Sequence, residues 1–375
     1  MGRILIAGFS ARGNAGDEAV LQCLYETLQP HHEVMIAVHP LHSHRDFRNW
    51  YPYDRCELVD ETVVSSVLNR PLDGMVIGGG GLPPAHAAHL ALTTRFLGFP
   101  TVLAGTDNSD LVRDDAAPLA FRDYMAGFHA IWLRYGSGVA ATRRLGIAAE
   151  HGADWAFSLE EAPQELPVDA PACAVTVRAW DPYLHDRRFR FRLHALFHGL
   201  REQGFEPFLL PFSPDDMQLA QQIAPFLEAK IAEHWWNPRA LKGLLRKCAL
   251  AVSVGRLHSL ILAAPTGIPI CYLAPPIAER DWATPMKISE LCAELAIRRY
   301  EEVDEFLGAL RAGDVCPADP GLMTEVMERR EHMAKAVLQA LAASPRDTFP
   351  WERTSTTISG ARTEMVHALP GHPAP

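Results

Sequence analysis

Arginine and histidine open a helical segment directly after a buried strand late in the chain. The apolar run Ala249–Val254 is followed by Gly255, Arg256 and His258, and an apolar stretch of helical character continues from there. A guanidinium, an imidazole and the free N–H groups of a helix N-terminus together suit a phosphate or a carboxylate. A lone histidine in an apolar helix is usually a core residue, but Arg256 beside this one favours an anion-binding site.

The same tripeptide occurs a second time without that setting. Arg192, Leu193 and His194 lie within the helical stretch Asp186–Gln203, with no strand immediately before them and no glycine at a turn. We therefore interpret this copy as part of an ordinary amphipathic helix.

A second candidate site lies near the start of the chain. Gly8, Gly13 and Gly16 separate a first strand from a helix, and they permit a ligand to approach the backbone. Their spacing is not Gly-x-Gly-x-x-Gly, so a dinucleotide-binding fingerprint fits poorly. Asp17 and Glu18 follow at the helix start. They are either an acidic first turn that complements the helix dipole, or carboxylates aimed at sugar hydroxyls as acceptor or general base.

Two further strand ends carry candidate groups. Asp73–Gly81 is a strand that ends in four glycines, which removes side chains from the edge where open α/β sheets bind ligands. A tight turn against a neighbouring element is the alternative. Val175–Arg178 is an apolar strand that terminates in arginine. That arginine is either a surface salt bridge or an anion clamp.

Composition restricts the function classes. A net charge of −10 argues against nucleic acid as the principal partner, although a local basic cleft can still hold a small anion. Seven widely spaced cysteines without a Cys-x-x-Cys pair predict a reducing compartment. No apolar stretch approaches the roughly 18 residues that cross a bilayer, and the first apolar run is too short for a secretory signal. We expect a soluble, cytoplasmic protein that is still able to associate with a membrane surface.

Two other features invite a functional interpretation. His86 and His89 have the spacing of neighbours on a helix, but no third ligand accompanies them, and we predict no metal site. Trp235 and Trp236 are interpreted as packing at a domain edge rather than as a stacking platform.

Short apolar runs alternate with helix-length segments along most of the chain, which predicts parallel sheets covered by helices. The acidic, proline-rich stretch Glu160–Pro171 is typical of an interdomain linker. We predict two doubly wound, Rossmann-like α/β domains facing a cleft, at 1–165 and 170–345, and a loose tail at 346–375. The expected strands are Arg3–Phe9, Glu33–His39, Gly74–Gly78, Thr101–Ala104, Ala130–Tyr135, Ala172–Arg178, Phe205–Pro211, Ala249–Val254 and Ile268–Ala274.

Taken in order, these motifs resemble the polysaccharide pyruvyl transferase family. Its members share a glycine-flanked Asn-x-Gly-Asp-Glu, a poly-glycine strand end, a strand ending in arginine, and a late Arg-Leu-His. The resemblance spans roughly residues 3–297. The matching residues here are Asn14–Glu18, Gly78–Gly81, Arg178, Arg256–His258, Ile131–Arg134 with Ser137, Gly267–Pro269 and Lys287.

The resemblance implies a GT-B-like fold and the transfer of pyruvate from phosphoenolpyruvate to a glycan as a ketal. It implies a bacterial enzyme of cell-envelope polysaccharide biosynthesis that needs no cofactor, with a glycan or a lipid-linked saccharide as acceptor. The N-terminal domain would then take the acceptor and the C-terminal domain the donor. The segments Leu82–Pro84 and Pro275–Pro276 depart from the family pattern, which bears on acceptor identity.

The resemblance also assigns roles. His258 would protonate the donor methylene or bind the leaving phosphate, and Asp17 would accept the proton of the attacking hydroxyl. The donor-binding residues would be Arg178, Arg256, His258 and Lys287. The acceptor-binding residues would be Asn14, Asp17, Glu18, Gly79 and Gly80.

Two other function classes stay open at this point. A nucleotide-sugar glycosyltransferase would use the same fold and a similar cleft, and a nucleoside diphosphate would then stabilise it better than phosphoenolpyruvate. A family member that has lost catalysis would bind an anionic glycan or the donor without turnover.

Overall fold

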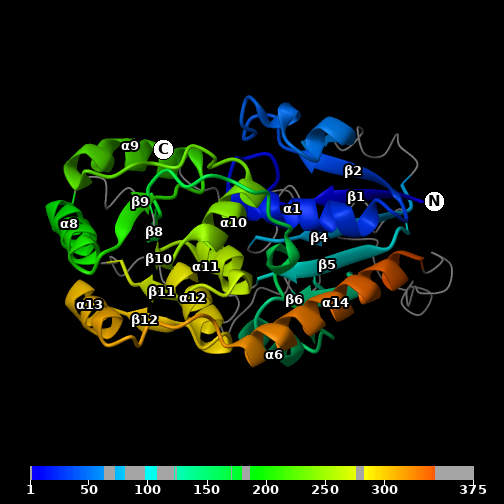
Figure 1. The fold of residues 1–375 in the computed structure, drawn as a ribbon. Coiled ribbons are helices and arrows are strands. Elements are labelled where there is room, and N and C mark those ends of the chain that lie inside the picture. Colours follow the sequence, from blue (N-terminus) through cyan, green and yellow to red (C-terminus); the bar gives the residue numbers. More distant parts are fainter. Residues whose placement is uncertain are drawn as a thin grey trace.

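Two parallel sheets form the protein, each covered by helices. The computed structural model describes residues 2–62, 72–80, 98–107, 122, 125–169, 171–179, 186–275 and 283–342. The seven-stranded sheet has the order β3-β2-β1-β4-β5-β6-β7, and the five-stranded sheet has the order β12-β11-β10-β8-β9. Figure 1 shows the two sheets side by side, with α10 and α11 at their junction and α1 lying over the first sheet next to them.

The first sheet takes its strands from the first 151 residues. Every pairing in it is parallel. Its elements are β1 (Arg3–Ala7), α1 (Ala15–Leu28), β2 (Glu33–Val38), the short helices η1 (Phe47–Asn49) and η2 (Tyr53–Arg55), β3 (Glu57–Asp60), β4 (Gly74–Gly78), β5 (Thr101–Thr106), β6 (Ala130–Leu133), α6 (Gly136–Arg144), β7 (Glu150–His151) and η3 (Trp155–Ser158).

The second sheet is built from the rest of the chain and is also wholly parallel. Its elements are β8 (Ala172–Val177), α8 (Arg187–Glu202), β9 (Glu206–Leu209), α9 (Pro214–Leu227), α10 (Pro238–Lys247), β10 (Leu250–Val254), α11 (Leu257–Ala263), η4 (Ala264–Thr266), β11 (Ile270–Leu273), α12 (Ala283–Glu294), β12 (Arg298–Tyr300), α13 (Val303–Arg311) and α14 (Pro320–Ala342).

All nine predicted strands are present, within two residues at either end. Three strands were not predicted, namely β3, β7 and β12. All three are edge strands: β3 and β7 end the seven-stranded sheet, and β12 ends the five-stranded sheet. Edge strands are short and charged, since one side faces water, so they lack the apolar run that marks a central strand. The predicted helix Asp186–Gln203 is α8 with its two caps.

Alternate residues of the central strands supply two different cores, which is why these strands are apolar throughout. In β1, Ile4 and Ile6 face the core shared with α1 and α14, whereas Leu5 and Ala7 face the opposite core. The second sheet divides in the same way between its two faces. Burial on both faces is the usual state of a parallel sheet between helices.

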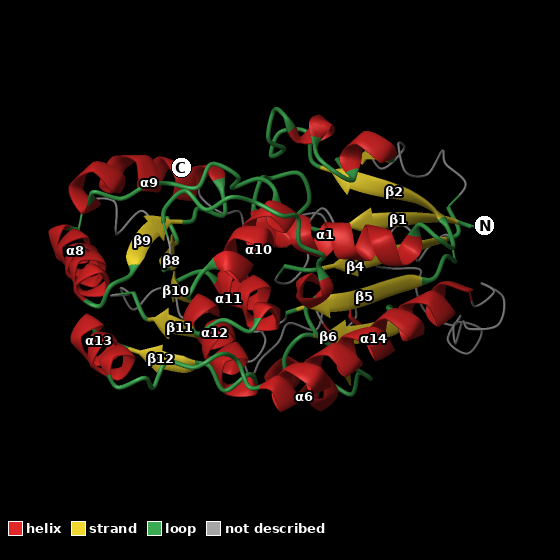
Figure 2. Cartoon of the chain, in the orientation of Figure 1, coloured by secondary structure: helices red, strands yellow, loops and turns green. Residues whose placement is uncertain are grey.

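The strand orders place four motifs at two neighbouring sites. Strand order reverses between β1 and β4 in the first sheet and between β8 and β10 in the second. Such switch points form ligand crevices at the carboxyl ends of the strands. The strand ends there lead into Gly8, Gly79, Arg178 and Gly255. Figure 2 shows the arrowheads of β1, β2 and β5 directed toward the second sheet.

The last helix belongs to the first sheet in space. Residues 170–345 were expected to form the C-terminal domain, but α14, within that range, packs along β5 and β6 (Figure 1). Its buried residues include Met333, whose sulfur lies against Gly152. The linker region from Glu160 onward contains no helix or strand in its described residues, as predicted. The expected tail lies outside the described residues.

Among the helices that the structure describes, none combines the length and the apolar character required to cross a membrane.

The docking of α14 predicts a measurable loss of stability. Met333→Ala should lower the free energy of unfolding by about 2–4 kcal/mol, because a fully buried side chain is replaced by a cavity. Lys335→Ala, on the exposed side of the same helix, should change it by less than about 0.5 kcal/mol. Urea unfolding followed by tryptophan fluorescence measures both, and equal effects would contradict the docked position.

Candidate functional site

The segment between β1 and α1 presents the N-terminus of α1 to the junction of the two sheets. Asn14 is the N-cap residue, and its side-chain oxygen accepts a hydrogen bond from the Gly16 amide at 3.1 Å. The amide of Ala15 donates to the carbonyl of Phe212 from the second half of the chain at 2.8 Å. The helix start is therefore held by both domains.

His258 reaches this helix start from the opposite domain. A Cβ atom added to Gly16 would lie 2.0 Å from Nδ1 of His258, so only glycine leaves room for the ring. The imidazole is 12% exposed. It follows Arg256, the N-cap of α11, at the end of β10. The glycine at position 16 thus serves the packing of a histidine rather than a left-handed turn.

The other side of the imidazole faces a buried ion pair. His258 Nε2 lies 3.5 Å from Oδ2 of Asp154, and Asp154 accepts a hydrogen bond from Nη1 of Arg134 at 2.6 Å. Both members of the ion pair are almost fully buried. Asp154 also caps η3, since its Oδ1 accepts from the amide of Ala156 at 2.9 Å. The carboxylate is thereby fixed relative to the ring.

The charges of Asp154 and Arg134 determine each other's ionisation. Burial alone would raise the pKa of Asp154, but the Arg134 guanidinium and the His258 ring outweigh it and hold that pKa well below its ordinary value. Burial alone would lower the pKa of Arg134, and the carboxylate of Asp154 more than reverses this. Asp154 is therefore an anion and Arg134 a cation at any physiological pH.

Arg134 also fixes the glycine turn after β4. Its Nη2 donates to the carbonyl of Gly80 at 2.7 Å, and the same carbonyl accepts from the amide of Asp107 at 3.1 Å. Gly79 and Gly80 both have positive φ. Added Cβ atoms would lie 2.6 Å from Val20 and 2.3 Å from the ring of Phe9, respectively. The turn needs glycine for both conformation and space; Gly81 lies outside the described residues.

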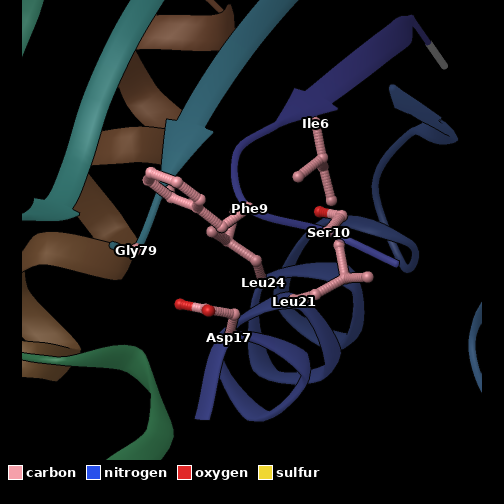
Figure 3. A pocket seen from close by; sticks show the side chains of 8 residues that line it. Ile6, Phe9, Ser10, Asp17, Leu21, Leu24 and Gly79 are labelled. Atoms are coloured by element: carbon pink, nitrogen blue, oxygen red, sulfur yellow. The ribbon is translucent and has the colours of Figure 1, made fainter. Parts of the chain in front are cut away.

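Asp17 stands on the first turn of α1, beside these charges. Figure 3 shows Asp17 and Phe9 extending from the β1–α1 segment on the side where Gly79 lies, at a small pocket. Burial raises the pKa of Asp17 above its ordinary value, and the charges of His258, Arg134 and Arg256 oppose that rise. A carboxyl with a raised pKa beside a small pocket is suited to accepting and releasing protons.

Glu18 is turned away from Asp17 into the first domain. Its Oε2 accepts a hydrogen bond from the hydroxyl of Tyr53 at 2.5 Å, and its Oε1 accepts from the amide of Gly13 at 3.3 Å. The Tyr53 hydroxyl in turn accepts from the amide of Ala11, a residue with positive φ. Burial raises the pKa of Glu18 to about 8. Glu18 therefore supports the loop that leads to Asp17.

Arg256 is held in a bidentate ion pair. Its Nε and Nη2 donate to the two carboxylate oxygens of Asp216, each at 2.6 Å, and Nη2 also donates to the hydroxyl of Ser213 at 2.8 Å. Within the described residues, Nη1 makes no hydrogen bond. The turn itself is fixed by Ser253 and Ser259, whose hydroxyls both donate to the carbonyl of Arg256.

The remaining predicted donor residues lie at the same junction. Arg178 follows β8 beside Gly255, where its Cβ is 3.4 Å from the position of an added glycine Cβ. Lys287 on α12 forms an ion pair of 2.7 Å with Asp107 at the end of β5. His86 and His89 lie outside the described residues.

The structure brings Asp17, Gly16 and His258 together, while Glu18 and Arg256 point into local ion-pair and hydrogen-bond networks. Sequence reasoning gave Asp154 no role, and it matched Arg134 to the family pattern without assigning it to the site. A signal for Arg134 was present, because it ends an apolar strand as Arg178 does and a buried arginine needs a carboxylate partner. Asp154 stands in an ordinary capping position, which hides its second role.

Comparison with known structures defines the architecture. The UDP-GlcNAc 2-epimerase from Methanocaldococcus jannaschii superposes with a TM-score of 0.61 at 11% identity, covering 90% of this chain and 100% of that chain. MurG from Acinetobacter baumannii superposes with a TM-score of 0.51 at 13% identity, covering 91% of this chain and 99% of that chain. The protein therefore has the two-domain GT-B-like fold, as predicted.

Comparison with family models defines the family. The model of polysaccharide pyruvyl transferase matches residues 14–275, which is more than half of the chain. The protein belongs to the polysaccharide pyruvyl transferase family, and the predicted resemblance is confirmed. No curated protein matches the sequence at a significant level.

The contact between Gly16 and His258 predicts an unusual response to alanine. Alanine is the better helix former by about 1 kcal/mol, so a gain in stability would be the ordinary result. We expect Gly16→Ala to destabilise the protein instead, because its Cβ would collide with the imidazole. Gly308→Ala in α13, where no atom lies within 4 Å, is the matched control and should be neutral or stabilising. A gain in the thermal midpoint of both variants would disprove the contact.

The raised pKa of Glu18 predicts a specific dependence of the free energy of unfolding on pH. Its folded pKa of about 8 exceeds the ordinary 4.5, so the folded state keeps a proton that the unfolded state loses between these values. The stability that the neutral carboxyl contributes is therefore lost as pH rises through this range. Glu18→Gln cannot ionise, so from pH 5 to pH 8 it should gain roughly a few kcal/mol relative to wild type. Urea unfolding at both pH values tests this, and a constant difference between the proteins would refute it.

Proposed function

We propose that the protein transfers pyruvate from phosphoenolpyruvate to two hydroxyls of a saccharide, forming a cyclic ketal. Family membership supports this reaction class. The observation that carries the proposal is the placement of His258 between Gly16 and the ion pair of Asp154 with Arg134, next to Asp17. That arrangement offers a proton donor and a proton acceptor at one junction between the two domains.

The reaction balances without an oxidant or reductant. A proton adds to the methylene carbon of phosphoenolpyruvate, which becomes a methyl group, and a sugar hydroxyl attacks the adjacent cationic carbon. A second hydroxyl displaces phosphate from that carbon. The products are the ketal and inorganic phosphate, and the proton released by each hydroxyl must be accepted by the protein or by the departing phosphate.

His258 is the proposed proton donor, and as an imidazolium it would also suit the leaving phosphate. Asp154 is the proposed positioning residue. Its carboxylate lies 3.5 Å from Nε2, so it would orient the ring. Arg134 keeps Asp154 ionised and does not itself need to contact the substrates.

Asp17 is the proposed acceptor of the sugar proton. Its raised pKa brings it closer to neutrality, where a general base is more effective. The backbone of Asn14, Gly79 and Gly80 lies nearby and would line the acceptor site. Glu18 would act on that site through the loop, because its carboxyl group accepts a hydrogen bond from Tyr53.

The donor carries a carboxylate and a phosphate, which need cationic partners. We propose that Asp216 and Ser213 orient Arg256 so that its Nη1 faces the donor. Arg178, at the neighbouring strand end, would hold the second anionic group. Lys287 would join the donor site by exchanging Asp107 for a donor oxygen.

A nucleotide-sugar glycosyl transfer is the second candidate. The likeness of the fold to MurG and to a UDP-GlcNAc 2-epimerase favours it, although one fold supports many chemistries. The two candidates differ in their donor. A thermal-shift titration with phosphoenolpyruvate and with UDP separates them, because only a ligand of the folded state raises the midpoint. Stabilisation by phosphoenolpyruvate that Arg256→Ala removes supports the proposal; stabilisation by UDP alone supports glycosyl transfer.

The two copies of the Arg-Leu-His tripeptide provide a matched pair for activity. His258→Ala should lower phosphate release from phosphoenolpyruvate by about 100-fold or more, because general acid catalysis is lost, while donor binding is largely retained. His194→Ala, on the exposed surface of α8, should be as active as wild type. The assay supplies a panel of saccharide acceptors and measures free phosphate. Wild-type turnover in His258→Ala would rule out the assigned role.

A further inference from the structure

A second pocket lies on the far side of α1 from Asp17, and the proposed reaction does not use it. It has a volume of about 430 Å³ and lies between α1, the η1–η2 segment, the interdomain linker and the start of α10. Among its lining residues are Gln22, Trp50, Tyr51, Arg55, Trp236 and Arg239. Its size and its position at a domain junction are those of a small-molecule site.

Aromatic rings form one wall of this pocket. Trp236 is 37% exposed and lies parallel to Trp50, with ring centroids 6.0 Å apart and an interplanar angle of 15°. Trp50 also stacks with His44, and their ring centroids are 5.0 Å apart. Trp235 instead packs edge-on against Trp50 and touches Gly13. The interpretation of both tryptophans as packing therefore fits Trp235, while Trp236 ends the stack with an accessible ring.

One residue that lines the pocket, Gln22, has a buried polar atom without a partner in the described residues. Gln22 is 5% exposed, and its Nε2 donates to the carbonyl of Tyr51 at 3.1 Å. Its Oε1 is buried and accepts no hydrogen bond in the described part of the chain. An unsatisfied buried acceptor costs about 1–3 kcal/mol, so this atom calls for a donor from a ligand. A hydroxyl group supplies such a donor.

The charges of the pocket are already balanced. Arg239 pairs with Glu26, and its Nη1 lies 3.6 Å from Glu160. Arg55 lies 3.9 Å from Asp54. Both guanidinium groups lie over the ring of Tyr51, at 5.5 and 5.6 Å from its centroid. A strongly anionic ligand would have to compete with these carboxylates, so a neutral ligand is favoured.

We propose that this pocket binds a neutral pyranose residue of a saccharide. One face of such a ring carries C–H groups that stack on an aromatic ring, here Trp236, and its hydroxyls donate hydrogen bonds, here to Oε1 of Gln22. Gln22 stands five residues after Asp17 on α1, a rise of about 7.5 Å along the helix axis. The pocket would hold a sugar further along the acceptor chain than the one that reacts, a reading that rests on the proposed function.

The test measures saccharide binding without donor or turnover. Lactose, maltose and cellobiose are titrated against the full-length protein, followed by tryptophan fluorescence and by saturation-transfer NMR. We expect at least one of them to bind, and Trp236→Ala and Gln22→Leu each to weaken that binding by about tenfold or more. Phe191→Ala removes an aromatic ring that is 66% exposed on α8, and it should bind as wild type does. Thermal midpoints identify any variant that fails to fold. If one of the two pocket variants does not fold, the other still tests the proposal by itself.

Binding that Trp236→Ala or Gln22→Leu removes, and Phe191→Ala keeps, supports the pocket. The proposal is overturned if the wild-type protein binds none of the three sugars, or if binding is unchanged in both pocket variants. The donor titration answers a separate question, because it monitors a different ligand on the other side of α1. Saccharide binding without phosphoenolpyruvate binding would reject the reaction and keep the pocket, whereas the reverse result would reject the pocket alone.

Discussion

The ion pair between Arg134 and Asp154 is the interaction on which the rest of the site depends. Two charges that are removed from water are tolerated when they pair closely and when hydrogen bonds occupy most of their remaining donors and acceptors. Arg134 donates to Asp154 and to the carbonyl of Gly80, and only its Nε lacks a partner in the described residues, while Asp154 accepts from Arg134 and from the amide of Ala156. The pair thereby ties the end of β6 to η3 and to the glycine turn after β4. His258 then completes the group from the other domain.

This constraint explains why position 16 is glycine and why the loop before α1 is held by contacts from both domains. The imidazole can approach Asp154 only because position 16 has no side chain. The helix start that carries Gly16 is held by Phe212 across the junction, and its loop is held by Glu18 and Tyr53. One continuous apolar core, which includes residues of both sheets, surrounds these contacts. The two domains therefore meet at a fixed geometry around the histidine.

Most of the fold follows from the pattern of the sequence, and the exceptions have physical causes. Central strands such as β1 and β10 are buried on both faces, so their apolar runs mark them clearly. The strands β3, β7 and β12 are short and polar and leave no such signal. The return of α14 to the first sheet depends on contacts between residues far apart in the sequence, such as Met333 and Gly152. Local periodicity predicts a helix there but not its partner.

The site was predictable where residue type and local context agree. His258 follows a buried strand, and its contact with the start of α1 agrees with the predicted junction of two domains. The environments of Glu18 and Arg256 were not predictable, because Tyr53 and Asp216 are brought to them only by the tertiary fold. Asp154 was missed for the opposite reason. Its capping role is a sufficient local explanation, so nothing in the sequence indicates that its other oxygen faces Arg134 and His258.

The most direct test of this account is a double-mutant cycle on phosphate release from phosphoenolpyruvate with Asp154→Asn, His258→Ala and the double variant. If Asp154 acts by positioning His258, the double variant will be about as slow as His258→Ala alone. Losses that multiply in the double variant would show that Asp154 acts independently of the histidine and would contradict the central role of the ion pair.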